Sequence, residues 1–244
     1  SLMNTLGKEF ASHGYPTLLT TTTHIMKPDF LSDESYIENE DLGQLANIFT
    51  NLKKNTLPLA ALGIPEKVVN SNIKWRSPSS DFCEKIAEFS KKFSTKNPYK
   101  FFKILCEGDG SKRLPIKLPK DGEPVFFPKT DTVIGVIGLS CLGKPIKETL
   151  FRYELLPNLT SLDNYFIKSL QSADIVTTDF LYRLCLSEKG LRKNITSQKF
   201  CIIFNQADIL DEKALAEVIT LRNQLQTKGI CPHIISVKNN YIIN

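Results

Sequence analysis

The sequence predicts an α/β fold, with a mostly parallel sheet flanked by helices. Short continuous apolar segments alternate along the chain with longer segments in which apolar residues recur at helical spacing. Strands without polar alternation are typical of parallel sheets covered by helices on both faces. With 244 residues, 41% of them hydrophobic and 23% charged, the chain has the composition of a globular protein. We expect one domain over residues 1–244, with inserted loops at about 26–40 and 112–130.

The first half of the chain begins with apolar residues at helical spacing from Leu2 to Ala11, and Gly14 is placed to end this helix. The β-branched run Thr17–Thr23 predicts a buried strand. The residues at 70–80 are polar and predict no definite element. The pattern further predicts a helix near 40–52, a strand at 57–64, a helix at 81–93, a strand at 101–106 and a proline-punctuated irregular stretch at 114–128.

The second half continues with a strand at Thr132–Gly138. Thr177 or Thr178 is placed to cap a helix at 179–186, because a threonine hydroxyl can accept a bond from an amide of the first helical turn. The pattern also predicts helices at 145–156 and 161–171, a strand at 200–204, a helix through 215–225 that ends before Gly229, and a last strand at 233–237.

The composition of the chain bears on which partners it binds and on the cellular compartment in which it works. Lys and Arg number 31 against 26 Asp and Glu, a net charge of +5 that is spread along the chain. A nucleic-acid binder concentrates basic charge on one element, so we predict no nucleic-acid partner. Six cysteines are too sparse for a disulfide framework. No apolar run approaches the roughly 20 residues that span a bilayer, and we predict reduced thiols, no membrane partner and a cytoplasmic location.

Polar side chains follow three of the predicted strands, and ligands of such folds bind outside the carboxyl ends of strands. The first group is Thr20–Thr23, which His24 follows. The second is Glu107 and Asp109, directly after an apolar segment as in a Walker B motif. A carboxylate there holds Mg²⁺ directly or through water, and a second one can orient the attacking water. We therefore predict that Asp109 and Glu107 are catalytic, with Asp109 as the metal residue.

The third group is the segment Asn205–Asp208, which resembles the Asn-Lys-x-Asp signature of guanine recognition. In that signature the aspartate accepts hydrogen bonds from the N–H groups of the base. Asn205 and Asp208 are thus predicted to bind a nucleotide, although Gln206 replaces the lysine whose stem packs over the base.

Each group also has a structural interpretation. A threonine run reflects β propensity, and a carboxylate pair after a strand is a common helix or turn cap. Asn205–Asp208 is equally compatible with a turn closed by an Asx hydrogen bond.

The segment Gly138–Pro145 matches the GxxxxGK part of a phosphate loop after a strand. A phosphate loop then needs Ser or Thr, whose hydroxyl binds Mg²⁺. Pro145 has no hydroxyl, so we do not interpret this segment as a phosphate loop.

Several motifs occur in a set order along the chain. They are TTTTHI at 20–25, EGDGS at 107–111 with LPIKLP at 114–119, EPV at 123–125, and VIGL at 136–139 with LGKP at 142–145. This order resembles the YqeC family of accessory proteins for selenium-dependent hydroxylases, over most of residues 1–210. Gly108 stands where that family usually has Ala, a change that we expect to matter little, and Phe151 replaces a family histidine.

The resemblance implies a P-loop NTPase-like fold, with Mg²⁺ and ATP or GTP as cofactors. The family's Gly-Ala-Gly-Gly-Lys-Thr segment lies immediately before a helix start like Ser1–Met3, so the first strand and the phosphate loop are expected to be missing from this chain. The resemblance places Mg-NTP next to that loop and to the strands ending at Thr23 and Glu107. Thr22, Thr23, His24 and Ser111 are the residues that it implies for binding the cofactor.

The function implied is that of a nucleotide-dependent accessory protein in the maturation of selenium-dependent molybdenum hydroxylases, with NTPase activity possible if a phosphate loop is supplied. Its partners are the nucleotide and the hydroxylase or its maturation machinery. An alternative is a non-catalytic binding module or scaffold that docks on a molybdoenzyme or cofactor carrier through Leu114–Pro128. A third hypothesis has Cys106 or Cys141 carry selenium, although Cys106 lies in a predicted strand, where a core thiol is inert.

Overall fold

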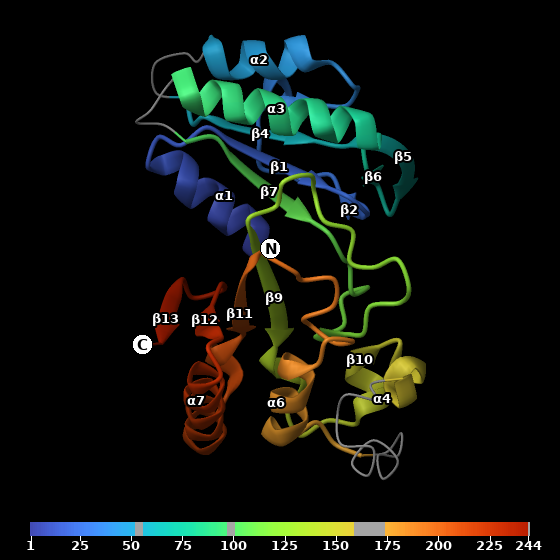
Figure 1. The fold of residues 1–244 in the computed structure, drawn as a ribbon, viewed down its shortest axis with the longest axis vertical. Helices are drawn as coiled ribbons and strands as arrows, with labels where there is room; N and C mark the ends of the chain where they lie inside the picture. Colours follow the sequence, from blue (N-terminus) through green and yellow to red (C-terminus); the bar gives the residue numbers. More distant parts are fainter. Residues whose placement is uncertain (52–55, 97–100, 159–173, 244) are drawn as a thin grey trace. The chain divides into compact units, whose positions relative to one another are not determined.

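The computed structural model describes residues 1–51, 56–96, 101–158 and 174–243. The chain forms two compact units, which we describe separately (Figure 1). Unit 1 comprises residues 1–110 and 125–129, and unit 2 comprises residues 111–124 and 130–244. Each unit has a sheet and a core of its own. The single domain that the sequence suggested stays a prediction, whereas the α/β class is confirmed.

Unit 1 contains a four-stranded sheet in the order β3-β4-β1-β7, with parallel pairing throughout. All five residues of the central strand β1 are buried, as expected for a parallel strand covered on both faces. The sheet confirms the predicted strands near 17–23, 57–64 and 101–106. Its strands are β1 (Thr17–Thr21), β3 (Tyr36–Ile37), β4 (Leu59–Leu62) and β7 (Lys103–Glu107).

Helices cover both faces of this sheet: α2 (Leu42–Thr50) and α3 (Ser80–Lys96) lie over one face, and α1 (Leu2–Ser12) lies over the other (Figure 1). Neighbouring residues of β1 face opposite cores. Leu18 packs with residues of α2 and α3, whereas Leu19 packs with Ala11 of α1. Gly14 has φ +80°, so it closes α1 in the left-handed conformation, as predicted.

A second, antiparallel sheet of unit 1 was not predicted. It has the order β2-β6-β5 and consists of β2 (His24–Met26), β5 (Ile64–Val69) and β6 (Asn72–Arg76). Trp75 on β6 is fully buried and its indole Nε1 donates to Glu38 Oε1 at 2.9 Å. The sequence analysis missed this sheet because β5 and β6 mix exposed charged side chains with exposed apolar ones such as Val68 and Val69, and Trp75 is their one fully buried residue.

The segment 26–40, predicted as an inserted loop, also contains regular structure. It holds the 3-10 helix η1 (Asp33–Ser35) and the edge strand β3. Only two residues long, β3 is too short to show a periodic pattern.

Unit 2 contains a four-stranded sheet in the order β13-β12-β11-β9. The strands β9, β11 and β12 are parallel, and β13 is antiparallel to β12. The bounds are β9 (Thr132–Gly138), β11 (Lys199–Asn205), β12 (Cys231–Ser236) and β13 (Tyr241–Ile243). The sheet is therefore mixed, and of its strands only β13 was missed by the sequence analysis.

Two helices of unit 2, α6 (Thr178–Leu186) and α7 (Glu212–Thr227), pack on one face of this sheet. Alternate sheet residues such as Ile202, Phe204 and Ile234 are fully buried in this core. Gly229 follows α7 with φ +74°, in agreement with the predicted helix end.

The predicted helix at 145–156 is wrong. Only α4 (Ile146–Thr149) is helical before β10 (Leu150–Phe151), which pairs in parallel with β8 (Ile116–Lys117). Arg152 then has φ +65°, which an α-helix cannot contain. The described residues of unit 2 also form the 3-10 helices η2 (Leu139–Cys141), η3 (Tyr153–Asn158) and η4 (Ala207–Ile209). The helix predicted at 161–171 falls on residues that the structure does not describe.

Of the helices described, none is both long and apolar enough to cross a bilayer.

The cap of α6 gives a first test. Thr177 is the N-cap, and its hydroxyl accepts from the amide of Phe180 at 3.1 Å. We expect Thr177→Ala to lower the free energy of unfolding by about 1 kcal/mol, the usual cost of losing such a cap. Urea unfolding measures the change, and Thr178→Ala, one residue inside the helix, is the control. Equal stability of the two variants would contradict the assignment of the cap.

Candidate functional site

The ends of strands β1 and β7 in unit 1 lie side by side, and Thr21 is opposite Glu107 in their register. Thr21 Oγ1 donates to the Glu107 carbonyl at 2.9 Å, and the Thr22 amide donates to the same carbonyl at 3.1 Å. Thr22 Oγ1 donates to the carbonyl of Val125 at 2.5 Å. These hydroxyls thus have structural hydrogen bonds as well as the predicted position at a strand end.

Thr23 and His24 continue the turn away from β1. The Thr23 amide donates to Thr21 Oγ1 at 2.9 Å, and its carbonyl accepts from the amide of Ser77. His24 is the first residue of β2 and exposed, with Nε2 3.2 Å from Glu66 Oε1. Its ring is therefore engaged with a carboxylate of the antiparallel sheet.

The predicted catalytic carboxylates lie on the same strand end. Glu107 ends β7, and its Oε1 would lie 3.4 Å from a Cβ atom added to Gly110. Asp109 lies between Glu107 and Gly110 in the segment that follows β7. The structure thus brings Thr22, Glu107 and Asp109 to one end of the sheet of unit 1, while their roles in metal binding and catalysis stay predictions.

Gly108 has little room for a side chain. A Cβ atom there would lie 2.9 Å from the carbonyl oxygen of Val125. An alanine at this position would require the backbone of Gly108 or Val125 to shift. The expectation that glycine in place of alanine matters little stays a prediction, although this conformation leaves little room for alanine.

Ser111, a predicted cofactor residue, belongs to unit 2. Its carbonyl accepts from the Leu114 amide at 3.1 Å and so closes a turn.

The strand ends of unit 2 are joined by side-chain hydrogen bonds. Asn205 Oδ1, at the end of β11, accepts from the amide of Val237 at 3.1 Å. Asp208 Oδ1 accepts from Ser236 Oγ at 2.6 Å, and Ser236 Oγ accepts from the amide of Asn239 at 3.1 Å. Asp208 therefore contacts the last residue of β12 and Asn205 contacts the residue that follows it, and neither bond is that of a local Asx turn.

Gln206 extends this group to a third strand. It has φ +71°, and its Oε1 accepts from the amide of Ser140, just beyond β9, at 3.3 Å. The ends of β9, β11 and β12 thus form one polar cluster, which we call the unit 2 strand-end cluster: Ser140, Asn205, Gln206, Asp208, Ser236 and Val237. The sequence analysis missed Ser236 and Val237, although their place directly at the end of a predicted strand was a usable signal.

The GxxxxGK segment is not a phosphate cradle. The Gly143 amide donates to the Val176 carbonyl at 2.9 Å, and the Lys144 amide donates to the Cys141 carbonyl at 3.1 Å. The Ile146 amide donates to the backbone carbonyl of Asp174 at 2.8 Å. A phosphate loop needs such amides for its ligand, so their use within the protein supports the sequence interpretation.

Lys117 of the LPIKLP motif and Glu123 of the EPV motif form a charged cluster with Arg152 in unit 2, which we call the Glu123 cluster. Glu123 accepts two hydrogen bonds from the guanidinium of Arg152 and lies 2.8 Å from Lys117 Nζ. The side chains of Lys117, Glu123 and Arg152 are only 9%, 20% and 16% exposed. The hydrogen bond from Arg152, followed by that from Lys117, lowers the pKa of Glu123 to about 2, although partial burial opposes the shift. These motif residues thus stabilise the fold.

The structure contains six free cysteines, and the reduced state of their thiols stays a prediction. Burial raises the pKa of Cys106 and of Cys141 to about 12. A thiol that stays protonated is a poor nucleophile, so neither side chain is suited to carry selenium. A different group, Cys201, Cys231 and His233, has ligand atoms within 4.8 Å of one another and could hold a metal ion.

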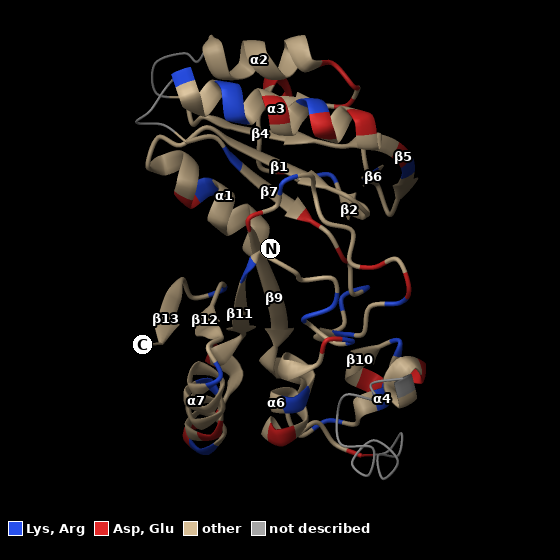
Figure 2. Ribbon diagram, in the orientation of Figure 1, with Lys and Arg blue, Asp and Glu red and all other residues tan. Residues whose placement is uncertain are grey.

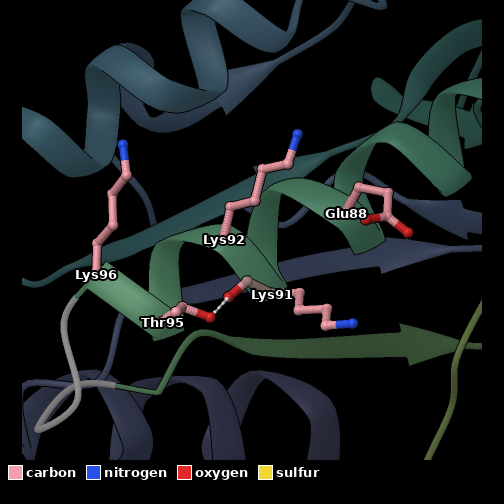
Figure 3. A pocket seen from close by; sticks show the side chains of 5 residues that line it. All are labelled: Glu88, Lys91, Lys92, Thr95 and Lys96. Atoms are coloured by element: carbon pink, nitrogen blue, oxygen red, sulfur yellow. Dashed lines mark hydrogen bonds between the residues drawn. The ribbon is translucent and has the colours of Figure 1, made fainter.

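Neither the mixed charges on the helix surfaces nor a hollow along α3 indicates a binding site. Figure 2 shows Lys and Arg beside Asp and Glu on α3 and on α7. A hollow along α3 is lined by Glu88, Lys91, Lys92, Thr95 and Lys96, all from this one helix (Figure 3). Since these lining residues include no polar group from a second element, a ligand would find no converging contacts there.

The described residues define an α/β protein whose parallel strands end in clusters of hydroxyl, amide and carboxylate groups. The family model described as YqeC protein matches residues 1–154. Because the match covers more than half of the 244 residues, the chain belongs to the YqeC family. The match includes Glu107, Asp109 and the Glu123 cluster, whereas Asn205 and Asp208 lie beyond it. No curated protein and no solved structure gives a significant match.

Glu123 gives a prediction about pH. A carboxylate with a depressed pKa contributes stability above its unfolded pKa of about 4.3 and loses it as the pH falls toward the folded value. We expect stability to drop between about pH 4.3 and pH 2. Glu123→Gln should lack this component and be less stable at pH 7 by about 3 kcal/mol, because two buried cations lose their anion. Thermal unfolding across pH measures both effects, with the exposed Glu148→Gln as control. An unchanged pH profile in Glu123→Gln would contradict the assignment.

Proposed function

We propose that this protein binds a guanine nucleotide with Mg²⁺ and acts as a nucleotide-dependent accessory protein in the maturation of selenium-dependent molybdenum hydroxylases in the cytoplasm. Its partners would be the hydroxylase or the machinery that matures it. Membership of the YqeC family supports the accessory role, and the unit 2 strand-end cluster supports the choice of base.

The observation that carries the choice of base is the pair of hydrogen bonds from the end of β12 to Asp208 and Asn205. They fix two side chains at the carboxyl edge of a parallel sheet, where ligands of this fold bind. A carboxylate has about four acceptor sites, and the hydroxyl of Ser236 accounts for one at Oδ1 of Asp208. Because Asn205 Oδ1 accepts from Val237, its amide nitrogen is oriented as a donor away from that bond.

These groups match guanine better than adenine. Guanine presents N1–H and the 2-amino group side by side, which a carboxylate accepts together, and its O6 and N7 accept from an amide nitrogen. Adenine presents the lone pair of N1 at the corresponding position, and that lone pair would face the carboxylate. We therefore propose GTP or GDP as the nucleotide rather than ATP.

A separate proposal concerns the strand ends of unit 1 taken by themselves, as a site for Mg²⁺ and phosphate. Asp109 would hold Mg²⁺ through water and Glu107 would orient the attacking water. Thr22, Thr23 and His24 would contact a phosphate group, and Ser111, which belongs to unit 2, stays a candidate apart from this site. The Glu107 carboxylate and the Thr22 hydroxyl at the end of the β1–β7 pair support this assignment.

The printed sequence contains no glycine-rich loop that ends in Gly-Lys-Thr or Gly-Lys-Ser. We propose that such a loop and its strand complete the nucleotide site. Among the described residues, β7 pairs only with β1 and β9 pairs only with β11, so each sheet ends in a strand to which a parallel strand could be added. Ile134 and Val136 of β9 are 39% and 43% exposed. Without the loop, charge-assisted phosphate contacts of about 1.5–3 kcal/mol each are lost, and binding should be weak.

The scaffold alternative receives less support. Much of the Leu114–Pro128 segment packs within the protein, because Ile116, Lys117, Leu118 and Pro119 are buried. Binding to a molybdoenzyme without any nucleotide would favour the scaffold, whereas strict dependence on Mg-nucleotide would exclude it.

Base specificity is tested by titrating the chain with fluorescent GDP and ADP. We expect GDP to bind more tightly, and Asp208→Asn to weaken GDP about 10–100-fold, since a charge-assisted pair is worth about 1.5–3 kcal/mol. The same variant should gain affinity for xanthosine diphosphate, whose 2-oxo group accepts from the new amide. The matched control is Asp179→Asn, an exposed carboxylate on α6. Equal affinity for GDP and ADP, or an unchanged preference in Asp208→Asn, would contradict the proposal.

Catalysis is tested in a version of the protein that carries a phosphate loop. We expect Asp109→Ala to abolish hydrolysis while the protein remains folded, because the metal residue is lost. Phosphate release measures turnover, with the fully exposed Asp121→Ala as control. Wild-type turnover in Asp109→Ala would remove Asp109 from the mechanism.

A further inference from the structure

Two neighbouring strands of unit 2 place three metal-ligating side chains together. Cys201 lies on β11, and Cys231 and His233 lie on β12. In the parallel register Cys201 faces Cys231, and Ile203 faces His233. Residues two apart on a strand point to the same side of a sheet, so all three side chains lie on one face.

This face is opposite to the face that forms the core. Ile202 and Ile234, which alternate with the ligating residues, are fully buried in the core with α6 and α7. Cys231 and His233 are exposed, and Cys201 is partly buried. An ion from solvent could therefore reach the group without any change in the core.

The distances suit a tetrahedral ion. Cys231 Sγ and His233 Nε2 are 3.3 Å apart, and the ligand atoms of all three residues lie within 4.8 Å of one another. Bonds of about 2.3 Å to sulfur and about 2.0 Å to nitrogen at tetrahedral angles require separations of roughly 3.5–3.8 Å between ligand atoms. Small side-chain rotations are enough to reach these values.

Pro232 lies between the two ligands of β12 and restricts the backbone there. Among the described residues, β13 pairs with Ile234–Ser236 and not with Pro232, so the missing N–H breaks no described ladder bond on that side. The Cys-Pro-His segment is thus held extended before any ion binds, which lowers the entropy cost of forming the site.

The types of ligand select the ion. Two thiols and an imidazole favour Zn²⁺ over hard cations such as Mg²⁺. Burial, and then the neighbouring Cys231, raises the pKa of Cys201 to about 11. A bound divalent cation offsets this rise in the pKa, because it stabilises the thiolate form of Cys201.

We propose that Cys201, Cys231 and His233 form a zinc site on the exposed face of the unit 2 sheet. The group has three members among the residues that the structure describes, which leaves the fourth tetrahedral position to water or to an exogenous thiolate. The bound ion would link β11 to β12. This site is independent of the nucleotide proposed above, since its residues lie in the body of the two strands and not in the unit 2 strand-end cluster.

The test uses the whole chain, reduced and stripped of metal with a chelator. We expect one Zn²⁺ per chain by elemental analysis after gel filtration, and one Co²⁺ with thiolate-to-cobalt charge-transfer absorption. Cys231→Ser and His233→Ala should each weaken Zn²⁺ binding at least 10-fold, and Cys231→Ser should reduce the charge-transfer band. Both residues are exposed, so these variants should keep the wild-type unfolding curve without metal. The matched control is His13→Ala, which removes an exposed histidine at the end of α1 in unit 1. This variant should bind Zn²⁺ like the wild type.

Two results would overturn the proposal. One is the absence of stoichiometric Zn²⁺ and Co²⁺ binding by the reduced protein, including the case in which Cys201 and Cys231 only form a disulfide on oxidation. The other is Zn²⁺ binding that Cys231→Ser and His233→Ala leave unchanged.

Discussion

Parallel pairing in register is the constraint on which the rest of this structure depends. The β1–β7 register sets Thr21 opposite Glu107, and the β9–β11–β12 registers bring Gly138, Asn205 and the end of β12 to one edge. Because parallel strands run in the same direction, their carboxyl ends and the loops that follow gather at that edge. Polar residues far apart in the chain thereby become neighbours, while buried aliphatic residues hold the strands behind them.

The hydrogen bonds at these ends hold polar side chains in place. Ser236 and Val237 fix Asp208 and Asn205 at the carboxyl edge of the unit 2 sheet. The Glu123 cluster differs, because its one carboxylate pairs with two cations inside unit 2. Polar residues that the sequence analysis singled out therefore divide into those that pair within a unit and those that lie at strand ends, a division that motif order alone does not reveal.

The parts that the sequence predicted well have strong local signals. Thr132–Gly138 is apolar along its length and is a strand with these same bounds, and the Thr177 cap and Gly14 were found from their chemistry. The failures lie where local signals are weak or contradictory. Residues 145–156 have helical composition, but Arg152 pairs with Glu123 in a left-handed conformation. The β5–β6 hairpin mixes exposed charged and exposed apolar side chains, and Trp75 is its one fully buried residue.

The sequence by itself determined the α/β class, most strand positions, the polar strand ends and membership of the YqeC family, because these depend on periodicity, on capping chemistry and on motif order within one stretch of chain. Only the tertiary structure decided that Asp208 meets Ser236, that Lys117 and Arg152 share Glu123, and that Cys201 lies beside Cys231 and His233. Asp208 and Ser236 are 28 positions apart and Arg152 and Glu123 are 29 apart, while the β11–β12 register sets Cys201 opposite Cys231. Packing of elements that are distant along the chain brings these residues together, and no pattern within one stretch of sequence specifies which elements pack.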